Sequence, residues 1–224
     1  MKVKRIALLI IVVTLAYVSQ AQPVYCLSYA DFQADKWLPL DTLIVKRHSR
    51  NRQLLIGGGE IKLTCGDKKT DKILKEQAFA VLYHDTIFIN CTKLQYDDNQ
   101  LCKGYTIAHH FARDKLLISG SATLEKKVMN DISTGAFMLG GGAMGGALAS
   151  HSMRGEMAVS KGCFITQIEF LSGIVKIVAV DDAFVRQNLA KNPELLKQYE
   201  QIRPEERLQA SHVIPLFRKA GLIE

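Results

Sequence analysis

The chain has 224 residues, of which 48% are apolar, and a formal charge of +7 at neutral pH. This length suits one domain, or one domain with an appendage, and the apolar content is enough for a packed core. Lysines and arginines are spread along the chain without interleaved aromatic residues, so the sequence argues against nucleic-acid binding. Weak attraction to anionic lipid or glycan stays open.

Residues 1–21 have the pattern of an export signal. Lys2, Lys4 and Arg5 precede an apolar run over 6–18, and the small-x-small sequence over 19–21 follows it. The apolar run is too short for a membrane anchor. We therefore predict a cleaved signal peptide and a location in the periplasm or the outer cell envelope.

The first part of the mature chain alternates between helix and strand signals. Ser28 followed by Asp31 predicts the start of a helix over 29–37, and strands are expected over 42–46 and 60–65. Residues 57–59 are three glycines and predict a flexible turn. A short helix with several lysines is expected within 67–76.

Three hairpins follow. The clearest pairs 78–83 with 86–91 about His84-Asp85, the second pairs 104–112 with 115–119, and the third pairs 164–170 with 174–180. Three hairpins predict a largely antiparallel sheet, and no strand-helix-strand rhythm indicates a parallel one.

Residues 181–224 predict a helical tail. A first helix begins at Asp181, a second has Pro193 in its first turn, and a third begins at Pro204 with a kink or restart at Pro215. Their short apolar stripes predict that they cover a face of the sheet or one another.

The order of these features resembles a group of uncharacterised exported proteins from Gram-negative bacteria. The resemblance lies in a strand pair that contains AVLYHDTIFIN, a Gly/Ala-rich apolar segment, a strand pair about a Ser-Gly turn, and a tail with NPELLKQYEQ. It covers most of the mature chain, implies a cell-envelope location and supplies no catalytic residue.

The anomalous stretch is residues 132–150, ISTGAFMLGGGAMGGALAS, which carries no charge and six glycines. As a helix it would be about 28 Å long, but six glycines would cost a helix in water about 5–6 kcal/mol relative to alanine. Four interpretations stay open: a close-packed structural connection, a contact with membrane or with a second copy, a disordered loop, and a GxGxxG nucleotide loop, for which the strand-helix-strand context is missing. The predicted contact residues are Gly135, Phe137, Met138, Leu139, Gly141, Gly142, Met144, Gly145, Gly146 and Leu148.

The reactive side chains form no recognised catalytic motif. Cys91 and Cys102 bracket a polar loop between two strands and are the candidate disulfide, although connectivity cannot be derived from sequence. His109 and His110 are adjacent on a strand, so they point to opposite faces. Cys163 with either histidine is the remaining candidate for a thiol–imidazole pair. No metal site and no cofactor are predicted.

These observations predict an α+β fold with a signal peptide over 1–21, a mainly β domain over 22–180 and a helical tail over 181–224. The leading functional hypothesis is a non-enzymatic exported envelope protein that contacts a membrane surface, a protein partner or its own copy, as a homo-oligomer, through residues 132–150. The alternatives are an envelope hydrolase with a dispersed active site and a binding module for a small ligand or glycan. The last rests on Trp37 and scattered tyrosines.

Overall fold

The computed structural model describes residues 22–49, 52–53, 59–96, 99–101, 103–111, 115–119, 123–125, 157–159, 162–167 and 174–224. The predicted signal peptide and the glycine-rich stretch over 132–150 lie outside these residues.

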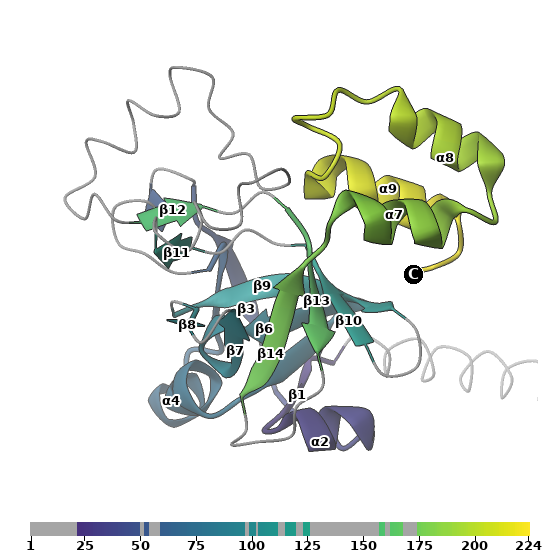
Figure 1. Ribbon diagram of the computed structural model, residues 1–224. Helices are drawn as coiled ribbons and strands as arrows, with labels where there is room; N and C mark the ends of the chain where they lie inside the picture. The colour runs from purple at the N-terminus through teal and green to yellow at the C-terminus, as the bar shows by residue number, and fades with distance from the viewer. Residues whose placement is uncertain are drawn as a thin grey trace, which may run out of the picture.

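The described residues form an α+β fold in which helices pack around one large, mainly antiparallel sheet (Figure 1). The strands are β1 Val24–Cys26, β2 Leu38–Pro39, β3 Ile44–Arg47, β4 Ile61–Thr64, β5 Ala80–Tyr83, β6 Thr86–Asn90, β7 Leu94–Tyr96, β8 Asn99–Gln100, β9 Tyr105–Phe111, β10 Lys115–Ile118, β11 Thr123–Glu125, β12 Met157–Val159, β13 Phe164–Gln167 and β14 Val175–Ala179. The helices are α2 Tyr29–Gln33, α4 Lys68–Glu76, the 3₁₀ turn η1 Cys91–Lys93, α7 Asp182–Leu189, α8 Pro193–Glu200 and α9 Ala210–Lys219.

The strands of the large sheet run in the order β2-β1-β5-β6-β9-β10-β13-β14-β7-β8, and β4 joins β9 with β3 at its side. The pairing of β14 with β7 is parallel, with Val175 opposite Leu94, whereas the other pairs are antiparallel. Since β7 follows β6 through η1 and yet pairs with β14, the sheet curls around its own apolar interior. β11 and β12 form a separate pair.

The three predicted hairpins are present as β5–β6, β9–β10 and β13–β14. The first turns at His84 and Asp85, which have positive φ values of 48° and 56°. Two consecutive left-handed residues are what a two-residue type I′ turn requires, and its twist matches that of the strands it joins. The turns of the other two hairpins lie outside the described residues.

The starts of α2, α4 and α7 were predicted correctly because side-chain caps mark them. The oxygens of Ser28, Asp67 and Asp181 accept from main-chain N–H groups three residues on, at the starts of α2, α4 and α7. The predicted end of α2 was wrong, since the helix ends at Gln33 rather than near Trp37. The left-handed backbone of Asp35, at φ 53°, turns the chain out of the helix before Trp37 is reached.

The last helix also differs from the prediction. α9 begins at Ala210, six residues after Pro204, and continues through Pro215 without a restart. Proline removes the N–H that would bond four residues back, so Pro215 costs α9 the hydrogen bond to the carbonyl of Ser211, in the first turn of the helix. The helix nevertheless continues to Lys219.

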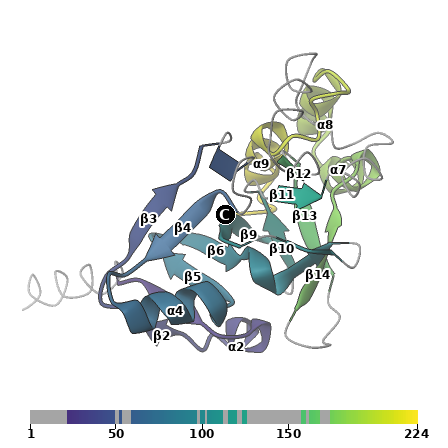
Figure 2. The ribbon, with the colours of Figure 1, turned by 90° about the vertical axis from the view of Figure 1, so that its left-hand side faces the viewer.

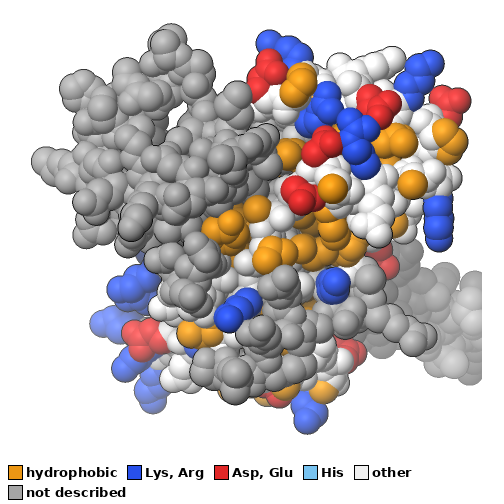
Figure 3. Space-filling view, viewed as in Figure 1, with side chains coloured by type: hydrophobic (Ala, Val, Ile, Leu, Met, Phe, Trp, Pro, Cys, Tyr) orange, Lys and Arg blue, Asp and Glu red, His pale blue; other side chains and the backbone are white. Residues whose placement is uncertain are grey.

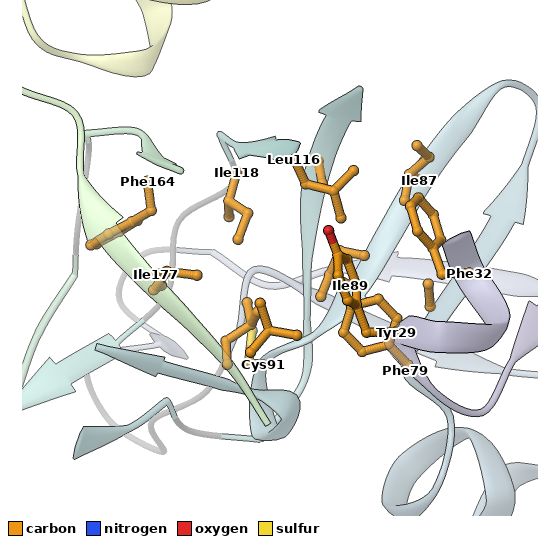
Figure 4. Packing of buried hydrophobic residues seen from close by; sticks show 14 of the residues in the cluster. Tyr29, Phe32, Phe79, Ile87, Ile89, Cys91, Leu116, Ile118, Phe164 and Ile177 are labelled. Atoms are coloured by element: carbon orange, nitrogen blue, oxygen red, sulfur yellow. The ribbon is translucent and has the colours of Figure 1, made fainter. Parts of the chain in front are cut away.

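The interior consists of three apolar clusters, one on the inner face of the curled sheet and two on its other side. Figure 4 shows part of the first cluster, where rings from α2 and from the residue before β5 meet aliphatic side chains of β6, β10 and β14. Its labelled members are Tyr29, Phe32, Phe79, Ile87, Ile89, Cys91, Leu116, Ile118, Phe164 and Ile177. The second cluster joins Phe111, Leu117 and Ile165 of the sheet to Val185, Tyr199 and Phe217 of the tail helices. The third lies under α4 and contains Ile61, Leu63, Leu74, Phe88 and Tyr105. The tail helices therefore share a core with the sheet.

Charged side chains tie the tail helices together. The Arg186 guanidinium contacts Asp182 at 2.6 Å within α7 and reaches Glu200 of α8. The Tyr199 hydroxyl donates to Asp182 at 2.8 Å, and Arg207 lies over the Tyr199 ring at 5.5 Å from its centroid. These groups are used for packing α7, α8 and the loop before α9, so the network needs no functional explanation.

Among the described residues, no helix is both long and apolar enough to cross a membrane.

Candidate functional site

The ten contact residues predicted from the glycine-rich stretch, Gly135 to Leu148, all lie outside the described residues. Their role in contact with a membrane or a partner stays a prediction. The Cys91–Cys102 disulfide also stays a prediction, because Cys102 lies outside the described residues. Cys91 is fully buried at the start of η1.

The thiol–imidazole pair finds no support. Cys163 is fully buried in the apolar cluster under the tail helices, and burial raises the pKa of its thiol to about 12. A thiol that stays protonated at neutral pH is a poor nucleophile. Burial also raises the pKa of the Cys26 thiol to about 12.

The two adjacent histidines do point to opposite faces of the sheet. The His110 ring stacks on Phe32 of α2 at 5.4 Å, whereas His109 Nε2 lies 3.0 Å from Ser119 Oγ on the tail side. Burial, followed by the charge of Arg218, lowers the pKa of His109. No three His, Cys, Asp or Glu side chains in the described ranges are placed to hold a metal ion. The reactive groups are therefore dispersed, which weakens the hydrolase alternative.

Trp37 does not form a sugar-binding platform with the tyrosines. Its indole N–H donates to Asp35 at 2.6 Å, and its ring packs edge-on against Phe32 at 5.6 Å. The aromatic rings near Trp37 belong to the inner core.

The candidate ligand site is a pocket of about 530 Å³ between α4, β4 and the segment that leads into β9. In Figure 2, α4 lies at the lower left beside β4 and β5, and in Figure 3 Lys and Arg side chains gather on that side of the molecule. The pocket is lined by His48, Lys62, Leu63, Thr64, Asp71, Lys72, Lys75, Glu76, Lys103, Gly104 and Tyr105. Its volume is in the range of about 300–1,000 Å³ that small-molecule sites occupy.

Helix α4 supplies the charged wall because of its sequence spacing. Lys75 lies three residues after Lys72 and four after Asp71, and Glu76 lies four after Lys72, so these side chains share one side of the helix. Leu74 is fully buried on another side and anchors the helix to the third cluster.

Buried polar groups fix the C-terminal end of α4. The Asn90 amide donates to the carbonyls of Leu74, Lys75 and Ala78, and the Tyr105 hydroxyl donates to the carbonyl of Leu74. The last carbonyls of a helix have no partner within the helix, so these bonds replace the missing ones. Burial raises the pKa of Tyr105, which keeps this part of the pocket uncharged.

The floor of the pocket depends on a close approach of two glycines. The Gly59 N–H donates to the Lys103 carbonyl at 2.7 Å, and Gly104 has a φ of +112°. A Cβ on Gly104 would lie 2.8 Å from the Gly59 nitrogen, and a Cβ on Gly59 would lie 2.5 Å from the Tyr105 carbonyl oxygen. Only residues without a side chain fit here.

Among the described residues that line the pocket, positive charges outnumber negative ones. Lys62, Lys72, Lys75 and Lys103 are exposed, and within the described part of the chain none of them forms an ion pair. The carboxylate of Asp71 accepts instead from the main-chain N–H and the thiol of Cys65, at 2.6 and 3.2 Å.

His48 adds a neutral polar group to the wall. Burial, followed by the charges of Arg52 and Lys62, lowers the pKa of its imidazole. The Nδ1 atom of His48 is buried and has no hydrogen-bond partner among the described residues. The pocket thus combines a rim of net positive charge with an uncharged floor, an arrangement suited to holding an anion.

Sequence reasoning found one part of this site and missed the rest. The lysine-rich helix within 67–76 was predicted and is α4. Lys62, Lys103 and His48 come from other segments, and only the β3–β4–β9 pairing brings them together. The signal available was the spacing of Lys72 and Lys75, which places both on one side of the predicted helix.

Comparisons with known proteins identify the family of this chain but suggest no activity. No curated protein and no solved structure matches it. A family model described as a family of unknown function (DUF6563) matches residues 24–224. This agrees with the resemblance to an uncharacterised group, and it leaves export and bacterial origin as predictions. Because the match spans nearly the whole chain, the protein belongs to the DUF6563 family.

Proposed function

We propose that the protein is a non-enzymatic binding protein that holds a small anionic ligand in the lysine-lined pocket. The observation that carries this proposal is the set of four exposed lysines around one pocket, none of which is paired within the described residues. Ordinary surface lysines are spread out, whereas these four converge on a space large enough for a ligand.

The charges alone would bind weakly. An exposed ion pair contributes about 0.2–1 kcal/mol, so four lysines supply about 1–4 kcal/mol. A free energy of about 4 kcal/mol corresponds to a dissociation constant of about 1 mM. A tighter complex therefore also needs contact with the floor around Gly104 and Tyr105.

A matched pair of double variants tests the proposal. Lys72→Gln with Lys75→Gln removes two charges from the pocket, and Lys68→Gln with Lys69→Gln removes two charges from the same helix outside it. Isothermal titration calorimetry at constant ionic strength would use three probes: inorganic phosphate, benzoate and phenyl phosphate. Saturable binding of at least one probe, lost in the first pair and kept in the second, is the expected result.

Absence of saturable binding by the unmodified protein for all three probes would refute the proposal. Equal losses in the two pairs would also refute it, because a diffuse positive surface and not the pocket would then attract the anion.

We also infer that the protein acts outside the cytoplasm, in the cell envelope. The charged start, apolar run and small-x-small site within residues 1–21 support this location. Mass spectrometry of the N-terminus in the periplasmic or envelope fraction should find Gln22 first, and an intact Met1 there would contradict it.

The uncharged run over 132–150 supports a second candidate function, contact with a membrane, a protein partner or a second copy. Fractionation of the full chain should find it membrane-bound or oligomeric, and deletion of residues 135–149 should abolish that behaviour. A soluble monomer that is unchanged by the deletion would count against this role.

A further inference from the structure

We propose that the ligand of the pocket is a phosphate monoester of a small, largely uncharged organic body. This inference rests on the proposed anion-binding function and names the chemical class of the anion. Three features of the pocket carry it: its net charge, the type of its cations and its size.

The net charge of the lining residues matches a dianion. The four lysines outnumber the two carboxylates, Asp71 and Glu76, by two, and the lowered pKa of His48 keeps its imidazole neutral. A phosphate monoester carries a charge of about −1.5 to −2 at neutral pH. A single carboxylate carries one charge at most and would leave part of the rim uncompensated.

The cations that line the pocket, among the residues the structure describes, are lysines. Arginine presents a planar fork that fits two oxygens of a carboxylate or a phosphate, whereas lysine acts as a point charge with three donors and also binds phosphate. Among the described residues that line the pocket, none is an arginine. Lys62 of β4, Lys72 and Lys75 of α4, and Lys103 before β9 come from three sides, so a group with three equivalent oxygens can meet several ammonium groups at once.

The pocket is too large for a bare phosphate ion. Its volume of about 530 Å³ is that of a small organic ligand. The floor is uncharged, since Leu63 and Tyr105 are buried apolar residues and the Tyr105 hydroxyl is occupied by the carbonyl of Leu74. The aliphatic stems of the lysines extend this surface toward the rim. A ligand body without charge therefore fits below the cationic rim.

The three probes named above also test this inference, with the full chain at fixed ionic strength. Phenyl phosphate should bind about ten-fold more tightly than benzoate, which has the same ring and a single carboxylate, because charge-assisted bonds are among the strongest polar contacts. It should also bind about ten-fold more tightly than inorganic phosphate, which lacks the body. Lys72→Gln with Lys75→Gln should weaken the binding of phenyl phosphate by about ten-fold or more. Lys68→Gln with Lys69→Gln should weaken it by about two-fold or less.

Each reversal of this order has a separate meaning. Benzoate binding as tightly as phenyl phosphate would overturn the phosphate assignment and leave the anion-binding function intact. If inorganic phosphate binds as tightly as phenyl phosphate, the proposal that the ligand has an organic body is overturned. If none of the three probes binds, the proposed function itself fails.

A vesicle assay distinguishes the two sources of such a group, a soluble ester and a lipid head group. Phosphatidylcholine vesicles with and without phosphatidic acid, which is a phosphate monoester, would be sedimented with the protein. Cosedimentation only with phosphatidic acid, lost in the pocket pair of variants, supports the lipid source; phenyl phosphate binding without cosedimentation supports the soluble source. Equal loss of cosedimentation in the Lys68/Lys69 pair would reveal diffuse attraction and overturn the pocket as the lipid site.

Discussion

Replacing Asn90 by alanine should strongly destabilise the protein, because this side chain joins α4 to β6. Asn90 is 1% exposed, and its amide donates to the carbonyls of Ala78 at 3.0 Å, Leu74 at 3.3 Å and Lys75 at 3.4 Å. Its oxygen accepts from the N–H and the hydroxyl of Thr92 at 3.1 and 2.9 Å. One buried side chain thus satisfies the end of a helix and the start of the η1 turn.

The magnitude follows from the number of bonds. Counting the two shortest contacts of the amide and the oxygen as full bonds, each contributes about 1 kcal/mol, and a buried carbonyl left without a partner costs a further 1–3 kcal/mol, roughly. We therefore expect Asn90→Ala to lower the free energy of unfolding by about 3–5 kcal/mol. For a chain of this length that is a fall of about 6–20 °C in Tm.

Urea unfolding followed by circular dichroism measures this loss. Tyr105→Phe is the matched comparison: it removes one donor from the carbonyl of Leu74, which Asn90 still serves, so it should cost only about 1 kcal/mol. The double variant should lose more than the sum of the two, since that carbonyl then has neither partner. A loss below about 1 kcal/mol in Asn90→Ala, or strict additivity, would refute the idea that these bonds hold α4 in place.

Three further predictions concern turns and titration. Gly104→Ala should cost about 2 kcal/mol or more in urea unfolding, because a Cβ there meets backbone at 2.8 Å as well as a φ of +112°; Gly66→Ala, at φ +88° in open space, should cost only about 1 kcal/mol. Replacing His84-Asp85 by Asn-Gly should stabilise the first hairpin by about 0.5–1 kcal/mol, since both residues have positive φ, and an unchanged Tm would count against strain in this turn. Folding lowers the pKa of His109 below 6.5, mainly by burial, so the unfolded state binds more protons; the free energy of unfolding should fall as pH drops through 6.5, and His109→Gln should reduce that slope.

The sequence predicted the framework of the fold because its signals are local. The three hairpins follow from alternation within short segments, and the caps at Ser28, Asp67 and Asp181 follow from residues within one helical turn. The end of α2 and the start of α9 were wrong because helix ends depend on tertiary packing more than on propensity. The parallel pairing of β7 with β14 could not be predicted, since it joins segments about 80 residues apart and no local pattern encodes it.

The site was predictable only where one element carries it. Lys72 and Lys75 share a helix face that periodicity can reveal. Lys62 and Lys103 reach the same pocket through the antiparallel contact of Ile61 with Tyr105, a single pair between β4 and β9. A cluster assembled by such a contact leaves no spacing in the sequence.

The placement of Lys62 separates a functional explanation of the lysines from a structural one. Lys62 lies opposite Lys46 in the β3–β4 pair, and like charges directly across an antiparallel pair destabilise it. Lys62→Gln should therefore raise the free energy of unfolding of the protein without ligand by about 0.2–1 kcal/mol, and the gain should shrink at high salt. The same substitution should weaken the binding of phenyl phosphate in the pocket.

Opposite effects on stability and on binding are expected of a side chain that serves a ligand, since a residue needed only for folding would lose stability when replaced. Urea unfolding at low and high salt, together with calorimetry on the same samples, measures both quantities. If Lys62→Gln destabilises the protein and leaves phenyl phosphate binding unchanged, Lys62 belongs to the architecture of the sheet edge and the pocket loses one of its four cations.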